Sequence, residues 1–418
     1  MTNSRLQAGV AAAEAAVEAV ADRLGDPGRV PGAVSLGEGH PGVALLHARL
    51  GREDPARRPV THAHLAAAVS RLGSPQPAAG LYYGVPALAF AVRSAVTVPQ
   101  DYARLLPALD ERVARHVRSV LARERARLAA GTAGPAMAAY DVIGGLAGIG
   151  RYLLACGAGQ RELLREVLEY FVELCRPLRN GGRTVPGWWV PGPPSPAAAD
   201  GYPRGHLNLG LAHGIPGPLA LLALAHREGV VVPGTDDAMR HIVGWLRKHR
   251  LQDGGTASSW PACLDPEHGH GRDGVHAPRS RSAWCYGAPG VARALQLAGL
   301  ALGEPGWQRE AVDAVLAVLE RPRREWELPD GMICHGTAGL LQVVTRMAQD
   351  GGDARLHAAL GPLAGEVLAH RDPAREFVFS SLCGFLEGAA GTALALADHL
   401  AGPVTDGGLP WDAALLIA

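Results

Sequence analysis

Residues 213–225 read HGIPGPLALLALA, a glycine- and proline-containing turn that runs directly into an apolar segment. Proline is accepted in the first turn of a helix, because its missing N–H would have no intrahelical partner there. The flanking glycines permit positive φ and close approach of the backbone. The segment Pro218–Ala225 is apolar around much of its circumference. The stretch therefore predicts a helix that is buried on most of its faces.

The same pattern, Gly, any residue, Pro or Ala, and usually a second Gly, recurs along the chain. The intervals between successive first glycines are 45, 61, 69, 73, 49 and 52 residues, and each can hold two helices with their loops. Segments between the turns, such as Glu162–Leu174 and Arg309–Leu319, show helical spacing of apolar residues. The turns begin at Gly39, Gly84, Gly145, Gly214, Gly287, Gly336 and Gly388.

Seven buried helices, each paired with a more amphipathic one, predict an all-α fold of seven helical hairpins with an inner and an outer helix layer. Closed as a ring, these hairpins form an α/α toroid (barrel). An open solenoid is the alternative, because repeat spacing alone does not exclude it. We expect a single domain over residues 1–418. Segments with strand periodicity are few, and the best candidate is Arg183–Val190.

Composition narrows the function classes. Lys+Arg and Asp+Glu are both 40, and this balance argues against a nucleic-acid partner. The sequence contains no run of 18 apolar residues, so we expect no membrane-spanning helix. Leu6–Leu24 is typical of an amphipathic helix and not of a signal peptide. Six cysteines without the spacing of a small disulfide scaffold suit a reducing compartment. We therefore expect a cytoplasmic protein, and the Ala/Arg/Gly-rich composition suggests a high-GC bacterium.

The repeat also assigns equivalent positions. Directly before the first glycine stand Glu38, Tyr83, Gly144, His213, Tyr286, His335 and Glu387. One residue earlier stand Gly37, Tyr82, Ile143, Ala212, Cys285, Cys334 and Leu386. In a toroid these positions face each other around one mouth of the barrel. Polar, titratable and metal-binding residue types are concentrated there, so we expect the functional site at this mouth.

Cys285 and Cys334 hold the same position in neighbouring repeats, and His335 adjoins the second. Two thiolates and an imidazole supply three zinc ligands and leave the fourth tetrahedral position open, as a catalytic zinc site requires. We therefore expect one Zn²⁺ per chain. The other interpretation, that these cysteines are small buried hydrophobes, is disfavoured by the shared position. It is preferred for the cysteines at other positions, which are Cys156, Cys175, Cys263 and Cys383.

A competing metal site would use His268, His270 and His276. These histidines lie in a Gly-, Pro- and Arg-rich loop, residues 254–281, without a helical scaffold to fix them. A solvated loop is the preferred interpretation.

His213 holds the equivalent position in the fourth repeat. A neutral imidazole near a bound cation can act as general acid or base near neutral pH, although a core histidine satisfied by hydrogen bonds fits the same pattern. Asp141 could orient His213 or cap a helix. Arg281 and Tyr286 flank Cys285 and could bind a carbonyl or a developing oxyanion, or belong to the scaffold.

Three segments in combination resemble the lanthionine synthetase C family, the cyclases of lanthipeptide biosynthesis. They are NLGLAHGIPG at 208–217, WCYGAPG at 284–290 and CHGTAG at 334–339. The resemblance covers nearly the whole chain. The sequence departs from the family pattern in the second turn, where Ala87 replaces the final glycine. A change in the geometry of that turn alone is expected. The resemblance implies an α/α toroid with a catalytic zinc, and it implies that Cys285, Cys334 and His335 are the zinc ligands. It also implies that His213 is the general acid or base, with Asp141, Arg281 and Tyr286 around it.

The resemblance further implies a stand-alone class I lanthipeptide cyclase. Such an enzyme adds cysteine thiolates of a dehydrated precursor peptide to dehydroalanine or dehydrobutyrine, forming lanthionine or methyllanthionine thioether rings. The ligand set fits this chemistry, because zinc-hydroxide hydrolysis usually employs His-rich or carboxylate ligands. The chain has no room for a dehydratase domain, so we expect a separate dehydratase, and an exporter, as its partners.

Two rival functions remain open at this point. One is a non-catalytic zinc- and thiol-binding relative of the same family. The other is a different α/α-toroid enzyme, such as a glycosidase, whose paired carboxylates could only be Glu38 and Glu387 at the mouth. Some family members carry a strand-containing insertion, but the stretch Trp188–Tyr202 is too proline-rich to form one.

Overall fold

The computed structural model describes residues 3–73, 80–131, 134–180, 182–252, 258–266, 280–404 and 408–418. These residues are mostly helical, which confirms the all-α prediction. Their contacts divide the chain into two compact units. Unit 1 comprises residues 1–113, 327–414 and 418, and unit 2 comprises residues 114–326 and 415–417.

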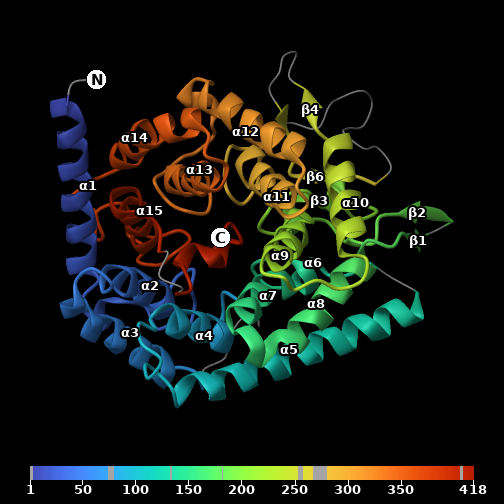
Figure 1. The fold of residues 1–418 in the computed structure, drawn as a ribbon, viewed down its shortest axis with the longest axis horizontal. Coiled ribbons are helices and arrows are strands. Elements are labelled where there is room, and N and C mark those ends of the chain that lie inside the picture. The colour runs from blue at the N-terminus through green and yellow to red at the C-terminus, as the bar shows by residue number, and fades with distance from the viewer. Residues whose placement is uncertain are drawn as a thin grey trace. The chain divides into compact units, whose positions relative to one another are not determined.

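Unit 1 contains inner and outer helices from both ends of the chain (Figure 1). Its inner helices are α2 (His40–Leu50), α4 (Gly84–Ser94), α13 (Thr337–Gly351) and α15 (Ala389–Ala401). Its outer helices are α1 (Asn3–Arg23), α3 (Arg58–Ser70) and α14 (Ala354–Leu368). The last inner helix, α15, packs against both α1 and α2. An open solenoid would keep its first and last repeats apart, so this contact contradicts that alternative.

Unit 2 repeats the arrangement with three inner helices. These are α7 (Leu146–Ala155), α9 (Pro216–Arg227) and α11 (Ala288–Ala301), and α9 packs against both of the others. The other helices are α5 (Leu105–Ala130), most of which belongs to this unit, α6 (Met137–Tyr140), α8 (Arg161–Leu174), α10 (Thr235–Lys248) and α12 (Pro305–Leu319). Every inner helix of the two units begins within one of the predicted turns.

Burial follows the predicted layers. All residues of the inner helix α2 are buried. In the outer helix α10 the buried residues instead recur at helical spacing, as Ala238, Met239, Ile242, Val243 and Leu246. The short 3₁₀ helices are Pro27–Arg29, Pro55–Arg57, Gly157–Gln160, Pro196–Gly201, Arg323–Glu325 and Trp411–Leu415.

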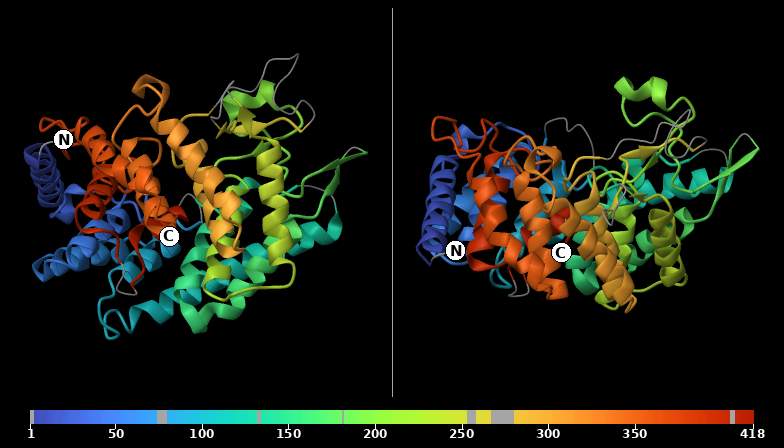
Figure 2. Two further views of the ribbon diagram at one scale, coloured as in Figure 1. Left: turned by 45° about the horizontal axis from the view of Figure 1, so that its top comes forward. Right: turned by 90° about the horizontal axis from the view of Figure 1, so that it is seen from above.

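The strands of the described residues form three antiparallel pairs. They are β1 (Leu178–Asn180) with β2 (Arg183–Val185), β3 (Leu207–Asn208) with β6 (Cys263–Leu264), and β4 (Leu251–Gln252) with β5 (Ser258–Ser259). The β1–β2 hairpin extends beyond the helices of unit 2 (Figure 2). The predicted strand Arg183–Val190 is confirmed only for its first three residues, because Pro186 follows and cannot donate to a ladder. Trp188–Tyr202 holds only an isolated bridge and a 3₁₀ helix, and no insertion domain.

The final glycine of the turn is required by close packing. A Cβ on Gly290 would lie 2.1 Å from the Trp284 carbonyl oxygen, and one on Gly339 would lie 1.9 Å from the Ile333 carbonyl oxygen. In the second repeat, where Ala87 stands at this position, the helix instead begins at Gly84 with a φ of 62°. The expected local change in that turn is therefore present.

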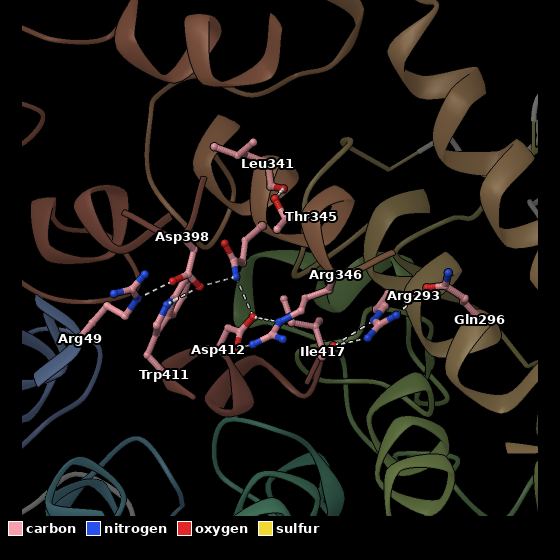
Figure 3. A network of polar contacts seen from close by, with 11 residues as sticks. Arg49, Arg293, Gln296, Leu341, Thr345, Arg346, Asp398, Trp411, Asp412 and Ile417 are labelled. Carbon is pink, nitrogen blue, oxygen red and sulfur yellow. Dashed lines mark hydrogen bonds and ion pairs between the residues drawn. The ribbon is translucent and has the colours of Figure 1, made fainter. Parts of the chain in front are cut away.

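The C-terminal segment is buried from Trp411 to Ile417. In unit 1 the Trp411 indole donates to Asp398 Oδ2 at 2.9 Å, and Asp412 accepts two hydrogen bonds of 2.6 Å from Arg346 (Figure 3). In unit 2 the Ile417 carbonyl accepts from Arg293 Nε at 2.9 Å. Charged and indole donors thus satisfy the buried carboxylates of Asp398 and Asp412 and the carbonyl of Ile417.

No helix among the described residues is long and apolar enough to cross a membrane.

Candidate metal and catalytic site

Backbone hydrogen bonds join the equivalent positions of consecutive repeats. In unit 2 the Ala212 amide donates to the Cys285 carbonyl at 3.3 Å. In unit 1 the Cys334 amide donates to the Leu386 carbonyl at 2.9 Å, and the Leu386 amide donates to the Gly37 carbonyl at 3.3 Å. These bonds confirm the equivalence that the sequence predicted for these positions.

Cys285 lies in the turn that precedes α11 and is 6% exposed. The turn is closed by Gly287, whose φ is 117°. A Cβ at Gly287 would lie 1.7 Å from the Arg281 carbonyl oxygen, so only glycine fits. The segment from Arg281 to Gly287 is therefore folded tightly back on itself, which fixes the backbone of the cysteine within it.

Cys334 and His335 lie in the corresponding turn before α13, and both are half-buried. Asp330 organises this turn. Its carboxylate accepts from the Met332 amide at 2.9 Å, and its carbonyl accepts from the Thr337 amide at 3.0 Å. The two bonds hold the backbone on either side of the cysteine and the histidine.

Cys285, Cys334 and His335 form a group that could hold a metal ion. Cys334 and His335 lie in the turn before α13 in unit 1, and Cys285 lies in the equivalent turn before α11 in unit 2. Two sulfur atoms and one imidazole nitrogen form a soft donor set that suits zinc and is poor for Mg²⁺ or Ca²⁺, which prefer oxygen ligands. The residues present therefore fit the expected metal. The competing histidines His268, His270 and His276 lie outside the described residues.

His213 and Asp141 form a close pair within unit 2. His213 Nδ1 lies 2.6 Å from Asp141 Oδ2, with the carboxylate side chain 3% exposed and the imidazole 32% exposed. The other carboxylate oxygen accepts from the Gly144 amide at 2.7 Å. Asp141 thus orients His213 and also holds the turn, whereas the N-cap of α7 is Gly145. The helix N-cap interpretation of Asp141 is therefore wrong.

Tyr286 lies beside this pair. Its ring centroid is 6.2 Å from that of His213, and its hydroxyl oxygen accepts a hydrogen bond of 3.0 Å from Asn208 Nδ2. Burial raises the pKa of Tyr286, and the bond from Asn208 partly opposes that change. The phenol is therefore a neutral hydrogen-bonding group at physiological pH.

Arg281 stands apart from these contacts. Its side chain is exposed, and its guanidinium makes no hydrogen bond or ion pair with the described part of the chain. Its backbone contributes to the tight turn at Gly287. The functional role of the Arg281 side chain stays a prediction.

Glu38 and Glu387, the carboxylates considered for glycosidase chemistry, are both exposed. Burial first, and then the charges of these two carboxylates, raise the pKa of Tyr83. The two side chains thus lie near a tyrosine at the equivalent position of the second repeat.

Comparison with known proteins places this geometry in a family. The model of the family described as lanthionine synthetase C-like protein matches residues 30–416. The chain belongs to the lanthionine synthetase C-like family. Nisin biosynthesis protein NisC of Lactococcus lactis subsp. lactis is 28% identical over 318 residues, which cover 75% of this chain and 73% of that protein. A solved structure of nisin cyclase matches with a TM-score of 0.78 at 24% identity, covering 92% of each chain. The structural likeness shows the α/α toroid fold that the repeat predicted.

Among the remaining thiols of this lanthionine synthetase C-like chain, burial raises the pKa of Cys175 and Cys263 to about 12 and that of Cys383 to about 11. These thiols are therefore protonated at neutral pH and poor as ligands. Cys263 and Cys383 are buried as expected. Cys156 and Cys175 are half-buried, so the interpretation as small buried hydrophobes holds for them only in part.

Asn208 also belongs to this site, although the sequence analysis did not single it out. It belongs to the NLGLAHGIPG segment, yet only His213 in that segment has a side chain typical of acid/base chemistry. The contact to Tyr286 joins residues 78 positions apart. The signal in the sequence was the presence of Asn208 and Gly210 shortly before the His213 turn, which does not indicate what these residues contact.

Proposed function

We propose that the chain is a zinc-dependent lanthipeptide cyclase. It would add cysteine thiolates of a precursor peptide to dehydroalanine or dehydrobutyrine residues of the same peptide. The observation that carries this proposal is the set of metal-binding side chains in equivalent turns, Cys285 before α11 and Cys334 with His335 before α13. Family membership and the similarity to proteins named nisin biosynthesis protein and nisin cyclase support the same activity.

Cys285, Cys334 and His335 are the proposed ligands of a single zinc ion. Bound there, zinc would hold the peptide cysteine as a thiolate and keep its sulfur nucleophilic at neutral pH. The two protein thiolates donate strongly to the metal and so favour thiol addition over activation of water, for which His-rich or carboxylate ligands are usual.

His213 would return the proton that the addition requires. As the sulfur–carbon bond forms at the β-carbon, the electron pair of the C=C double bond moves toward the α-carbon and its carbonyl, giving an enolate. The thiol proton leaves to solvent, and one proton must reach the α-carbon. Asp141 accepts from His213 Nδ1, so Nε2 is the atom that would hold and donate this proton.

Tyr286 and Arg281 are the proposed donors to the enolate oxygen. A phenol O–H or a guanidinium aimed at a developing oxyanion stabilises the transition state more than the ground state. Tyr286 is supported by its place beside His213, with ring centroids 6.2 Å apart. Arg281 is supported by its position in the same turn as Cys285.

The proposed substrate is a peptide already dehydrated by a separate dehydratase, and a dehydratase and an exporter are the proposed partners. We further propose a cytoplasmic location and a single domain over residues 1–418. The balance of 40 basic and 40 acidic residues supports the absence of a nucleic-acid partner.

Counting thiols tests the activity. Thiol addition does not change the mass of the peptide, so the zinc-loaded protein is incubated with the dehydrated precursor peptide and the remaining thiols are alkylated and counted by mass spectrometry. We expect one alkylation fewer for each ring. The Cys334→Ala protein, which lacks a ligand, is the control and should leave the count unchanged. An unchanged count with the zinc-loaded wild type would contradict the cyclase and favour a non-catalytic zinc- and thiol-binding relative.

A further inference from the structure

The side chain of Asn208 is fully buried and uses its whole amide. Its Oδ1 accepts from the Gly210 amide at 2.9 Å, while its Nδ2 contacts the Tyr286 hydroxyl at 3.0 Å and Met137 Sδ at 3.4 Å. A backbone N–H only donates, so the atom that faces Gly210 must be the oxygen. The orientation of the amide is therefore determined, and the atom that faces Tyr286 is an N–H donor.

The surroundings of Tyr286 leave little freedom for a different arrangement. A Cβ on Gly210 would lie 2.5 Å from the Tyr286 ring and 2.6 Å from the Cys285 carbonyl oxygen. The asparagine and the glycine two residues later thus hold the phenol from two sides. The carbonyl of Asn208 accepts from the Ile215 amide at 3.3 Å, so the same residue also supports the turn that carries His213.

The donor character of the Asn208 amide fixes what Tyr286 can do. Because the phenolic oxygen accepts from Asn208, the phenolic proton cannot point along that bond. No described residue accepts that proton. The hydroxyl is left as a hydrogen-bond donor whose partner is not supplied by the described part of the chain.

We propose that Asn208 is a positioning residue that presents the Tyr286 O–H as a donor to a substrate carbonyl oxygen. The inference rests on the proposed function, in which that oxygen becomes an enolate. Asn208 does not touch the substrate. It determines the direction of the Tyr286 proton and so selects Tyr286 as an oxyanion donor.

Asn208→Asp tests the direction of the bond, because it keeps the size and the Gly210 bond of the side chain. At pH 8 the new carboxylate can only accept a hydrogen bond. Tyr286 would therefore donate its hydroxyl proton to the carboxylate and no longer to the substrate. We expect Asn208→Asp to lower the rate of ring closure about as much as Tyr286→Phe, on the order of 10²-fold. Asn208→Ala leaves the Tyr286 hydroxyl free to donate to the substrate, so it should lower the rate of ring closure less than Asn208→Asp does. Adding Tyr286→Phe to Asn208→Asp should cause no further loss.

A readout independent of activity is the tyrosine doublet in Raman spectra, whose intensity ratio distinguishes a phenol that accepts from one that donates. The spectrum of the wild type minus that of Tyr286→Phe isolates the doublet of Tyr286, and its intensity ratio should be that of a phenol that accepts a hydrogen bond. The corresponding difference in the Asn208→Asp background should show a strong donor. Zinc content should be equal in all these proteins.

Two results would overturn the positioning role while leaving the cyclase intact. One is an active wild type in which Asn208→Ala loses at least as much activity as Asn208→Asp. The other is loss of zinc in the Asn208 variants, which would show a structural role. A wild type that closes no ring would instead reject the proposed function, and the inference with it.

Discussion

His213 Nδ1 lies 2.6 Å from Asp141 Oδ2, although the two residues are 72 positions apart in the chain. A carboxylate only accepts, so Nδ1 must carry a proton and Nε2 is the atom left to exchange protons. The other oxygen of Asp141 accepts from the Gly144 amide at 2.7 Å. One side chain therefore sets the tautomer of the imidazole and holds the turn before α7.

Asp141→Asn separates these two roles. The side-chain oxygen of the asparagine can still accept from the Gly144 amide. Its NH₂ group, however, would donate to His213 Nδ1, so the neutral imidazole would carry its proton on Nε2. We expect ring closure to slow by about 10²–10⁴-fold, the usual contribution of a general acid or base. The melting temperature and the zinc content should change little. Asp141→Ala, which removes both bonds, should slow ring closure and also lower the melting temperature. Equal rates for Asp141→Asn and wild type would remove the pair from the mechanism.

Metal content tests the ligand set. We expect the purified wild type to bind one zinc ion per chain, and Cys285→Ala or Cys334→Ala to lose it, because neither leaves enough ligands for a stable tetrahedral site. Cys175→Ala is the matched control, since burial raises the pKa of that thiol to about 12 and it should stay protonated. The measurement is elemental analysis after gel filtration with a weak chelator. Equal zinc in all three variants would contradict the assignment.

The sequence predicts the toroid well because the cause of the fold is local and repeated. A side chain at Gly290 or Gly339 would collide with a carbonyl oxygen six residues earlier, so the glycines recur wherever the turn recurs. The same register located Cys285 and Cys334. Each of these features depends on chain neighbours, which a sequence displays directly.

Contacts between repeats were harder to predict. The sequence left open whether Asp141 orients His213 or caps a helix, because that depends on how two turns 72 residues apart meet. The strand pair β3–β6 has only two residues a side, too few for a periodicity to appear. The C-terminal segment belongs to no repeat, and its burial depends on Arg346 and Arg293 in distant helices.

Three buried histidines of unit 1 form a cluster in which two of the rings share one acceptor. The Leu24 carbonyl lies 2.8 Å from His64 Nε2 and 3.2 Å from His47 Nε2, so both nitrogens must donate. His64 Nδ1 is then unprotonated and accepts from His40 Nδ1 at 3.2 Å. All three rings are neutral in this arrangement. Burial lowers the pKa of His40 and His47 from 6.5 to about 4 and also lowers the pKa of His64.

This cluster predicts a loss of stability in mild acid. The unfolded chain binds protons at these histidines near pH 6.5, while folded His40 and His47 resist protonation to about pH 4. Stability from the cluster is therefore full above pH 6.5 and falls as the pH drops from 6.5 toward 4, by at most about 3 kcal/mol for each of these two rings. Asp398, whose pKa burial raises to about 6, acts in the opposite direction.

Comparison with His47→Gln isolates the histidine contribution. Glutamine can still donate to the Leu24 carbonyl but does not titrate. The free energy of urea unfolding, measured between pH 7.5 and 4.5, should fall less steeply with acid in this variant than in the wild type. His357→Gln, at an exposed position, is the control and should follow the wild type. Identical slopes for wild type and His47→Gln would reject the cluster as the source.

The buried pair of Asp412 and Arg346 predicts the largest effect on stability. The Asp412 side chain is 0% exposed, and it accepts two hydrogen bonds of 2.6 Å from Arg346 and one of 2.7 Å from Gln342. Asp412→Ala would leave the arginine charge buried without its partner, which typically costs about 3–5 kcal/mol. Glu173→Ala removes an exposed ion pair with Arg176 and should cost about 1 kcal/mol or less. Urea denaturation of the three proteins measures both effects. Because Asp412 lies in the buried C-terminal segment, a loss below 1 kcal/mol for Asp412→Ala would mean that this segment is not held by its charges.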